Sequence, residues 1–277
     1  TGLLSDSSRT TLRVEDRRAR DDGQYGIALR YFADWLGAGT ELSLYHANYH
    51  SRFPIASFNA TEESSCRAAD GVALPGIPIP GLGEVGPQQL ACLGLLDGDP
   101  AAIASAIGGA LTGNVAFPGN ALPVDTGALF FEYPEDIKLW GFSFNTLIGD
   151  VALQGEYAFR ENLPVQVHQV DLVYAHLQPA FPANDVDLLG LATVPGARNA
   201  VPDYVETRYR GNESIEAGEY IRGYERLKVG QLNLGGTLTF GGSNWFGANQ
   251  ILGIFEFGAV HVVDMPDESE IQFNGSG

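Results

Sequence analysis

Charged and amide side chains occur singly in stretches that are otherwise apolar, and they occupy alternate positions. In residues 151–162, Gln154, Glu156 and Arg160 alternate with apolar and aromatic residues. Side chains of a β-strand repeat every two residues, so these polar groups would share one face. The same pattern in other stretches extends the predicted inward-facing set to Gln24, Arg30, Asp34, Glu41, Gln154, Glu156, Arg160, Asn233 and Glu256.

A face of this kind could do one of two things. If it lined water, its charges and amides would select among solutes by charge and hydrogen bonding. If its opposite charges paired, they would form a salt-bridge network that fills and stiffens an enclosed interior. Both signs of charge are present, so the sequence leaves both interpretations open.

Metal binding is not favoured. His46 and His50 are four residues apart, a spacing that suits zinc on a helix but separates the two residues by about 13 Å on a strand. Acidic residues in the loops, such as Glu62, Glu63 and Asp185, could hold divalent cations, but no loop has the ligand spacing of an EF-hand. We therefore predict no metal site and no cofactor.

Catalytic motifs are missing too. The chain has no G-x-S-x-G, no H-E-x-x-H and no phosphate-binding loop. We predict that the protein is not an enzyme.

Composition narrows the class of protein further. Acidic residues exceed basic ones by 34 − 16 = 18, which argues against nucleic-acid binding, because phosphates need a basic surface. No stretch approaches 18 uncharged apolar residues, so no transmembrane helix is predicted. The mean hydropathy of −0.04 does not separate a soluble protein from a barrel, whose strands alternate in polarity.

Six stretches carry the two-residue period. About a dozen residues each, they are longer than the usual strand of about 5–6 residues and suit a tilted membrane-spanning strand of about 9–11 residues. In residues 24–36 the apolar wall consists of Tyr25, Ile27, Leu29, Tyr31 and Trp35. The predicted strands are residues 24–36, 40–52, 136–147, 151–162, 224–240 and 250–263.

The phase is unclear in one of these stretches. In residues 40–52, Leu42 and Leu44 lie on one face while Tyr45 and Tyr49 lie on the other. A β-bulge, or a strand end rising out of the membrane, would explain this switch.

The connections between these strands alternate strictly between short and long, the long ones covering about residues 53–135 and 163–221. Antiparallel strands put every second connection at the same end, so all short turns would lie on one rim. We therefore predict an all-β, antiparallel up-and-down transmembrane β-barrel with short periplasmic turns and long extracellular loops. Six strands cannot close a barrel, since known ones have at least about 8. Residues 1–277 are thus expected to form a single β-barrel domain that is a fragment of a longer barrel.

The first long connection is rich in proline and glycine, but two local features stand out. Residues 100–111 can form a helix, with Asp99 as its N-cap and Pro100 at its first position. Cys66 and Cys92 both lie in this connection, and a disulfide between them would brace the loop in an oxidising compartment.

Several short runs resemble one family. They include GQYGIALRY at residues 23–31, YHSR at residues 49–52 with Pro54, YPEDI at residues 133–137, ENLP at residues 161–164, and residues 261–266. They resemble the proteobacterial outer-membrane proteins known as domain of unknown function 1302, with this chain corresponding to the middle portion. The resemblance implies an exported outer-membrane barrel whose partners include a lipoprotein and a resistance-nodulation-division (RND) type transporter. It implies no catalytic residues.

These observations give three functional hypotheses. The first is a channel or receptor in the bacterial outer membrane for a small or hydrophobic solute, surrounded by lipid and lipopolysaccharide and working with a periplasmic transporter or lipoprotein. The second is a structural or surface-interaction barrel with a plugged lumen. The third is a soluble secreted β-protein or enzyme, which would pack the apolar wall against a second sheet.

Overall fold

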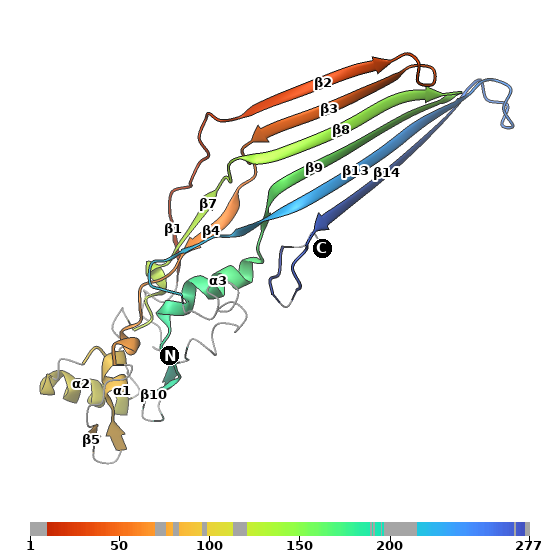
Figure 1. Cartoon of the computed structure of the whole chain (residues 1–277). Helices are drawn as coiled ribbons and strands as arrows, with labels where there is room; N and C mark the ends of the chain where they lie inside the picture. The colour runs from red at the N-terminus through yellow and green to blue at the C-terminus, as the bar shows by residue number, and fades with distance from the viewer. Residues whose placement is uncertain are drawn as a thin grey trace.

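The structure is a computed structural model of the chain. It describes residues 10–69, 76–79, 83–95, 99–112, 121–188, 190, 192–194, 196, 215–268 and 270–274. Long strands at one end and a smaller, mixed unit at the other give the molecule an elongated shape (Figure 1).

Six long strands form one antiparallel sheet, in which neighbours in space are also consecutive among the long strands. Each of the six predicted strands is present, and the last two differ from their predicted bounds by at most one residue. In spatial order they are β2 (Tyr25–Ala33), β3 (Thr40–Tyr49), β8 (Ile137–Ile148), β9 (Val151–Gln166), β13 (Tyr224–Phe240) and β14 (Ile251–Val263).

The pairing register divides the side chains of this sheet into two faces. The apolar face carries residues such as Leu29, Phe142 and Tyr157, and the polar face carries residues such as Arg30, Ser143 and Glu156. The pairing of β3 with both of its neighbours is unbroken, so its side chains alternate between the two faces without a shift. Tyr45 is two residues from Ser43 and therefore lies on the polar face. The bulge that we considered for this strand is therefore not there.

The register instead shifts between β9 and β13. Leu227 pairs with Leu163 and Val229 pairs with Arg160, so two steps along β13 face three along β9. The extra residue of β9 lies at Glu161 or Asn162, near the end of the sheet from which the long connections leave.

The connections are sorted as predicted. The turns after β2, β8 and β13 all lie at one end of the sheet, and the long connections leave from the other end (Figure 1). Gly37, Gly39 and Gly149 have positive φ, which glycine adopts without the cost that a Cβ brings, and so they allow the tight reversals. We call the two ends the turn end and the loop end.

At the loop end, two of the long strands continue into a second sheet. β4 (Ile55–Asn59) follows β3, β7 (Ala128–Glu132) precedes β8, and the two pair in antiparallel fashion. Within the predicted loop 53–135, the sequence analysis missed both strands. The outer strands of this sheet are β1 (Leu12–Arg13), parallel to β7, and β12 (Tyr220–Ile221), antiparallel to β4.

A helix covers this second sheet. α3 (Gln169–Leu177) begins three residues after β9 and is followed by the short 3₁₀ helix η4 (Gln178–Ala180). Its buried Leu172 and Ala175 pack with Phe58 of β4 and Ile221 of β12 in a small hydrophobic core. The first part of the predicted long connection 163–221 is thus the end of β9 followed by α3.

The far tip of the molecule consists of short elements held by a disulfide. Cys66 and Cys92 are bonded, as predicted, and both are buried beside Val186 and Val194. The bond joins η2 to α1. The elements of this region are η2 (Ser65–Ala69), β5 (Ile77–Ile79), β6 (Gly83–Val85), α1 (Pro87–Cys92), α2 (Pro100–Leu111), η3 (Val124–Thr126), β10 (Val186–Leu188) and β11 (Ala192–Val194).

The helix α2 has the predicted bounds. The carboxylate of Asp99 accepts a hydrogen bond from the backbone N–H of Ala101 at 3.0 Å, which is the N-terminal capping that the sequence indicates. Among the residues that the structure describes, no helix has the length and apolarity needed to span a membrane.

The long sheet is open within the described chain. β2 pairs only with β3, and β14 pairs only with β13, so each leaves one edge of backbone N–H and C=O groups unpaired.

Candidate functional site

The polar face of the long sheet gathers the predicted residues into adjacent rows. Because all six strands are paired in register, one residue from each strand lies in each row. The first row is Phe32, Glu41, Asn145, Gln154, Gly235 and Glu256. The second row, one step nearer the loop end, is Arg30, Ser43, Ser143, Glu156, Asn233 and Gly258.

These two rows surround a hollow on the polar face. Its volume is about 560 Å³, and its lining includes Glu41, Asn145, Gln154, Glu156, Asn233 and Glu256. Acidic and amide groups from five strands thus converge on one concave surface, which presents hydrogen-bond donors and acceptors to whatever fills it.

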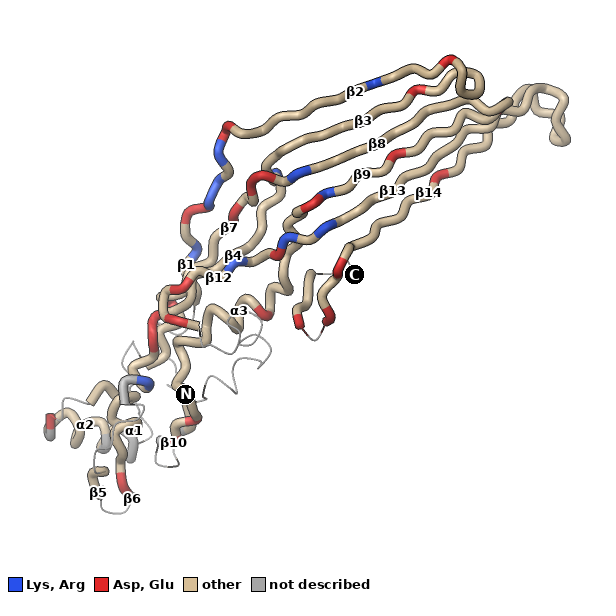
Figure 2. The backbone as a smooth tube through the Cα atoms, in the orientation of Figure 1, with Lys and Arg blue, Asp and Glu red and all other residues tan. Residues whose placement is uncertain are grey.

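In the middle of the long sheet, the charged residues all lie on one face. Between the loop-end rim and the turns, the charged residues of the six strands are Arg30, Glu41, Glu156, Arg160 and Glu256, and all five lie on the polar face. In Figure 2, these few charges are spread along the long strands, while the β1–β12 region at the loop end is densely charged. In the described part of the chain, no ion pair joins any two of the five. The salt-bridge network that we considered is therefore not formed among them.

Two tyrosines cross-link the polar face by hydrogen bonds. The Tyr45 hydroxyl is 2.9 Å from the Ser143 hydroxyl on the neighbouring strand. Arg160 donates from Nε to the Tyr49 hydroxyl at 3.3 Å. These contacts stiffen the sheet. The side chains of Glu41, Glu156 and Glu256 remain exposed on the same face.

Three predicted residues lie outside the two rows. Arg160 is on the polar face but four residues nearer the loop end than Glu156. Asp34 follows the end of β2 and belongs to the turn, so it is not in the rows. Gln24 precedes β2, and its side-chain oxygen accepts a hydrogen bond from the backbone N–H of His50 at 3.1 Å. Both were assigned to the strand because alternation alone does not show where a strand ends.

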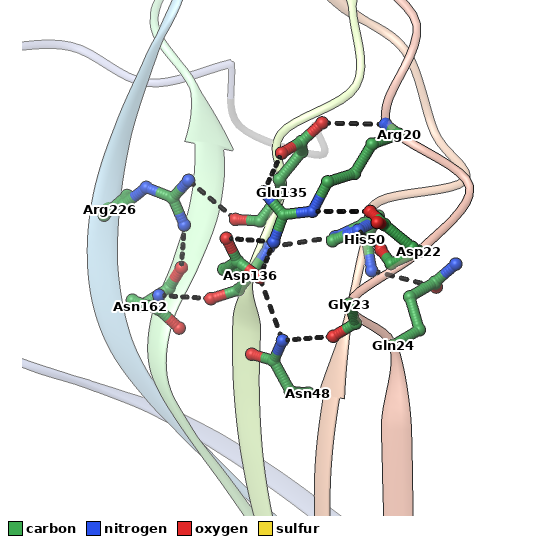
Figure 3. A network of polar contacts seen from close by, with 10 residues as sticks. All are labelled: Arg20, Asp22, Gly23, Gln24, Asn48, His50, Glu135, Asp136, Asn162 and Arg226. Atoms are coloured by element: carbon green, nitrogen blue, oxygen red, sulfur yellow. Dashed lines mark hydrogen bonds and ion pairs between the residues drawn. The ribbon is translucent and has the colours of Figure 1, made fainter.

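A second polar cluster lies where the long sheet meets the loop end, and we call it the rim network. Figure 3 shows its members: Arg20, Asp22, Gly23, Gln24, Asn48, His50, Glu135, Asp136, Asn162 and Arg226. Arg20 contacts Glu135 at 2.7 Å and both carboxylate oxygens of Asp136 at 2.6 and 2.8 Å. Arg226 donates to the backbone oxygen of Glu135 at 2.8 Å. The network therefore ties β2, β3, β8, β9 and β13 together where they leave the sheet.

The rim network fixes the tautomer of His50. Its Nδ1 accepts the backbone N–H of Asp136 at 3.1 Å, while its Nε2 lies 2.8 Å from the carbonyl oxygen of Asp22. A carbonyl only accepts, so Nε2 must carry the proton and the ring is neutral in this arrangement.

Asp136 is held in an unusual state by the same network. It has a φ of 57°, a region that favours glycine, asparagine and aspartate. The hydrogen bond from Asn48 and the Arg20 guanidinium hold the pKa of the Asp136 carboxyl below its usual value. The carboxylate stays ionised and keeps the segment before β2 attached to the start of β8.

Sequence reasoning missed several members of the two sites. Ser43, Ser143 and Asn145 alternate with apolar residues as the predicted residues do, and that signal was available. The rim network gave no comparable signal, because its partners are as much as 116 residues apart in the sequence.

Neither the histidine pair nor the acidic loops form a metal site in the described part of the chain. No group of three or more His, Cys, Asp or Glu side chains is close enough to hold an ion there. His46 contacts Trp140 on the apolar face, with ring centroids 4.1 Å apart and planes tilted by 34°, whereas His50 belongs to the rim network.

Comparison with known families agrees with the resemblance noted in the sequence. Residues 3–276 match the family described as protein of unknown function (DUF1302), and the chain belongs to that family. No curated protein and no solved structure matches it.

Proposed function

We propose that the long sheet is part of the wall of an outer-membrane β-barrel, with its polar face toward an aqueous lumen and its apolar face toward lipid. The segregation of charge carries this proposal. A Lys or Arg in contact with the bilayer midplane costs about 2–4 kcal/mol, and all five mid-sheet charges avoid the apolar face. The middle of the apolar face is thus free of charge, as contact with hydrocarbon requires.

The dimensions of the apolar face support the same arrangement. From Ile251 to Val263, both on the apolar side of β14, the chain advances twelve residues, or roughly 40 Å along a strand. At a tilt of about 40° this corresponds to roughly 30 Å across the membrane, enough to span the apolar band of about 25 Å in known barrels. Aromatic side chains at both ends, such as Trp140 near the loop end and Trp35 near the turns, suit the two interfaces.

Exposure of the apolar face argues against a soluble β-protein. Ile27 is 70% exposed and Leu29 is 64% exposed, and no described segment packs over them. In water, so broad an apolar surface would drive association. In a bilayer, the unpaired edges of β2 and β14 would need partner strands, because backbone groups there must all be hydrogen-bonded. Further strands would complete the wall.

As a function, we propose passage or capture of a small or hydrophobic solute through the lumen. The hollow on the polar face, with its exposed glutamates and amides, would provide the selective surface. In the orientation of known barrels the turn end faces the periplasm. A lipoprotein or an RND-type transporter would meet the protein there, near the exposed Trp245 and Phe246.

Single-cysteine labelling tests the orientation of the two faces. Leu29 and Arg30 are adjacent on β2 but point to opposite faces, so Leu29→Cys and Arg30→Cys form a matched pair. In intact membranes, a water-soluble thiol reagent should label Arg30→Cys and leave Leu29→Cys unlabelled, and the native cysteines do not react because they form a disulfide. Equal labelling of the two would contradict the barrel.

In planar bilayers, the purified full-length protein should conduct ions. The absence of current, together with unchanged solute uptake in a deletion strain, would contradict the conduit.

One observation favours a second function, a surface-interaction barrel with a plugged lumen. The long connections are not extended loops but a folded unit with its own core around α3 and a disulfide at its tip. Such a unit is suited to binding a partner outside the cell. Absence of conductance together with binding to cell-surface material, lost when the unit is removed, would favour this function over the conduit.

A further inference from the structure

A groove lies on the apolar face, next to the loop end. Its volume is about 300 Å³ and its surface is almost entirely apolar, with Leu29, Leu44, His46, Trp140, Phe142 and Tyr157 among the residues that line it. It crosses β2, β3, β8 and β9. The His46 and Trp140 rings contact each other at its loop-end edge, with centroids 4.1 Å apart and planes tilted by 34°.

A charged row borders this groove on the side of the loop end. On β8, Lys138 is two residues from Trp140, so it lies about 7 Å nearer the rim on the same face. Glu161 lies beside it on β9, where its carboxylate accepts a hydrogen bond from the Trp140 indole at 2.8 Å. Lys228 lies next, on β13, about 10 Å from Lys138 at two strand spacings.

The two lysines are available to an external anion. Both are exposed, and neither ammonium has an ion-pair partner in the described part of the chain, Glu161 included. Arg226, two residues from Lys228 on the same face, adds a third cation while it donates to the backbone oxygens of Glu135 and Asn162. The row thus keeps a net positive charge despite Glu161, although the whole chain is strongly acidic.

We propose that this groove and row form a binding site for lipopolysaccharide, with an acyl chain in the groove and a lipid A phosphate between Lys138 and Lys228. The inference rests on the proposed barrel, which puts the loop end at the outer leaflet. Its basis is complementarity: an apolar channel with cations about 7 Å beyond its rim-side edge matches an amphiphile whose phosphate is next to its acyl chains. Free phosphate would fill only the row.

The test uses the full-length protein in lipid nanodiscs and the double variant Lys138→Gln/Lys228→Gln. Binding of bisphosphorylated lipid A is measured by native mass spectrometry and by titration, with dephosphorylated lipid A, phosphatidylglycerol and inorganic phosphate as the other ligands. The double variant should weaken binding of lipid A by roughly 10- to 30-fold, since each lysine near a charged surface contributes about a factor of five. Arg30→Gln, which removes a charge from the opposite face, should bind like the wild type.

Four outcomes would overturn the site: equal affinity of the double variant and the wild type, equal binding of dephosphorylated lipid A, tighter binding of phosphatidylglycerol, or competition by inorganic phosphate at comparable concentration. Heat-modifiable migration in gels shows whether each variant is folded, and Lys138→Arg/Lys228→Arg should restore binding if charge is the cause. A wild-type protein that inserts into nanodiscs and conducts but does not bind lipid A contradicts only this inference. A protein that never inserts contradicts the proposed barrel as well.

Discussion

The guanidinium of Arg20 contacts both carboxylate oxygens of Asp136, a residue 116 positions later in the chain. This pair links the segment that leads into β2 with the first residue before β8. Arg20 also donates from its backbone N–H and its side chain to the carboxylate of Glu135. These hydrogen bonds fix the orientation of the segment before β2, in addition to the attraction between the charges. The second sheet, α3 and the disulfide-bonded tip together form the folded unit at the loop end, which we call the loop-end unit. The rim network therefore fixes the point where the long sheet ends and this unit begins.

Replacing Arg20 with Gln should loosen the segment before β2 and leave the long sheet intact. Both partners are partly exposed, so the effect is modest, and we expect protease cleavage within residues 17–24 to accelerate roughly 2- to 5-fold. Mass mapping of the fragments measures this. The matched control is Arg18→Gln, which should cleave at the wild-type rate; equal rates for all three proteins would show that the network does not hold the segment.

At Asp136, two substitutions separate charge from backbone conformation. Asp136→Asn keeps a residue that tolerates a φ of 57° but removes the charge, whereas Asp136→Ala also introduces backbone strain. We expect Asp136→Ala to expose the segment more than Asp136→Asn in the same cleavage assay. In the wild type the pKa of Asp136 is lowered, so its contribution is present above pH 3.8 and is lost only as the pH falls through its folded pKa. A release of the segment near neutral pH would contradict this assignment.

The loop-end unit should weaken on mild acidification because of His176. Burial lowers the pKa of His176 to about 4; its ring stacks on Phe58 at 4.7 Å and its Nε2 is 2.9 Å from the Thr11 hydroxyl. The unfolded state takes up the proton first as the pH falls, so stability is complete above about pH 6.5 and decreases toward pH 4, by up to about 3 kcal/mol. Thermal unfolding followed at pH 7.5 and 4.5 measures the loss.

His176→Gln should flatten this pH dependence. The control is His46→Gln, which lies on the long sheet and outside the folded unit at the loop end; this variant should retain the wild-type slope. A His176→Gln protein with an unchanged slope would assign the pH dependence to other groups.

Removing the disulfide should destabilise the tip without disturbing the long sheet. The bond closes a loop of 26 residues, and loop-closure entropy for such a length corresponds to about 3 kcal/mol. In Cys66→Ser/Cys92→Ser, or after reduction of the wild type, hydrogen exchange should accelerate in η2 and α1 and remain slow in β8 and β9. Faster exchange throughout β8 and β9 would mean that the tip and the sheet unfold as one cooperative unit.

Gly223 is expected to tolerate no side chain. A Cβ at this position would lie 1.7 Å from the carbonyl oxygen of Ala56. The backbone N–H of Gly223 also donates to the Ser57 hydroxyl at 2.8 Å. Gly223→Ala must push β12 away from β4, at a cost of roughly 1–3 kcal/mol or more, detectable as a lower unfolding temperature of the loop-end unit. Gly241→Ala, where a Cβ would meet nothing within 4 Å, should leave this temperature unchanged.

Under the proposed conduit, the glutamates of the polar face should favour cations. Glu41, Glu156 and Glu256 line one hollow and have no ion-pair partner among the described residues. Replacing all three with Gln should lower the cation-to-anion permeability ratio several-fold, as read from reversal potentials in a salt gradient. Glu63→Gln, outside the long sheet, should change nothing. An unaltered ratio in the triple variant would exclude the polar face from the ion path.

Periodicity predicted the long sheet because each of its strands has one apolar and one polar side. The bounds of β13 follow from the alternation in residues 224–240, and those of α2 follow from Asp99 and Pro100. The phase problem at Tyr45 arose from the assumption that tyrosine belongs with the apolar residues. Its hydroxyl instead binds Ser143, so an aromatic ring on the polar side was misread as a change of phase.

The second sheet was not predicted because its strands are only two to five residues long, too short to show a clear two-residue period. Residues 55–59 and 128–132 are surrounded by proline and have no two-residue period that distinguishes them from a loop. Their pairing depends on β3 and β8 being neighbours already. The rim network is harder still, because Arg20, Asn48 and Asp136 come together only after three strands have paired, and no local pattern encodes that contact.

The two free edges of the long sheet run in opposite directions, since β2 leads from the loop end to the turn end and β14 returns. In a wall where every neighbour is antiparallel, the strands that fill the gap between such edges must be even in number, and with none at all β14 would pair directly with β2. Under the proposed barrel, the wall would therefore grow by hairpins and not by lone strands. A circumference built in this way can change only in steps of two.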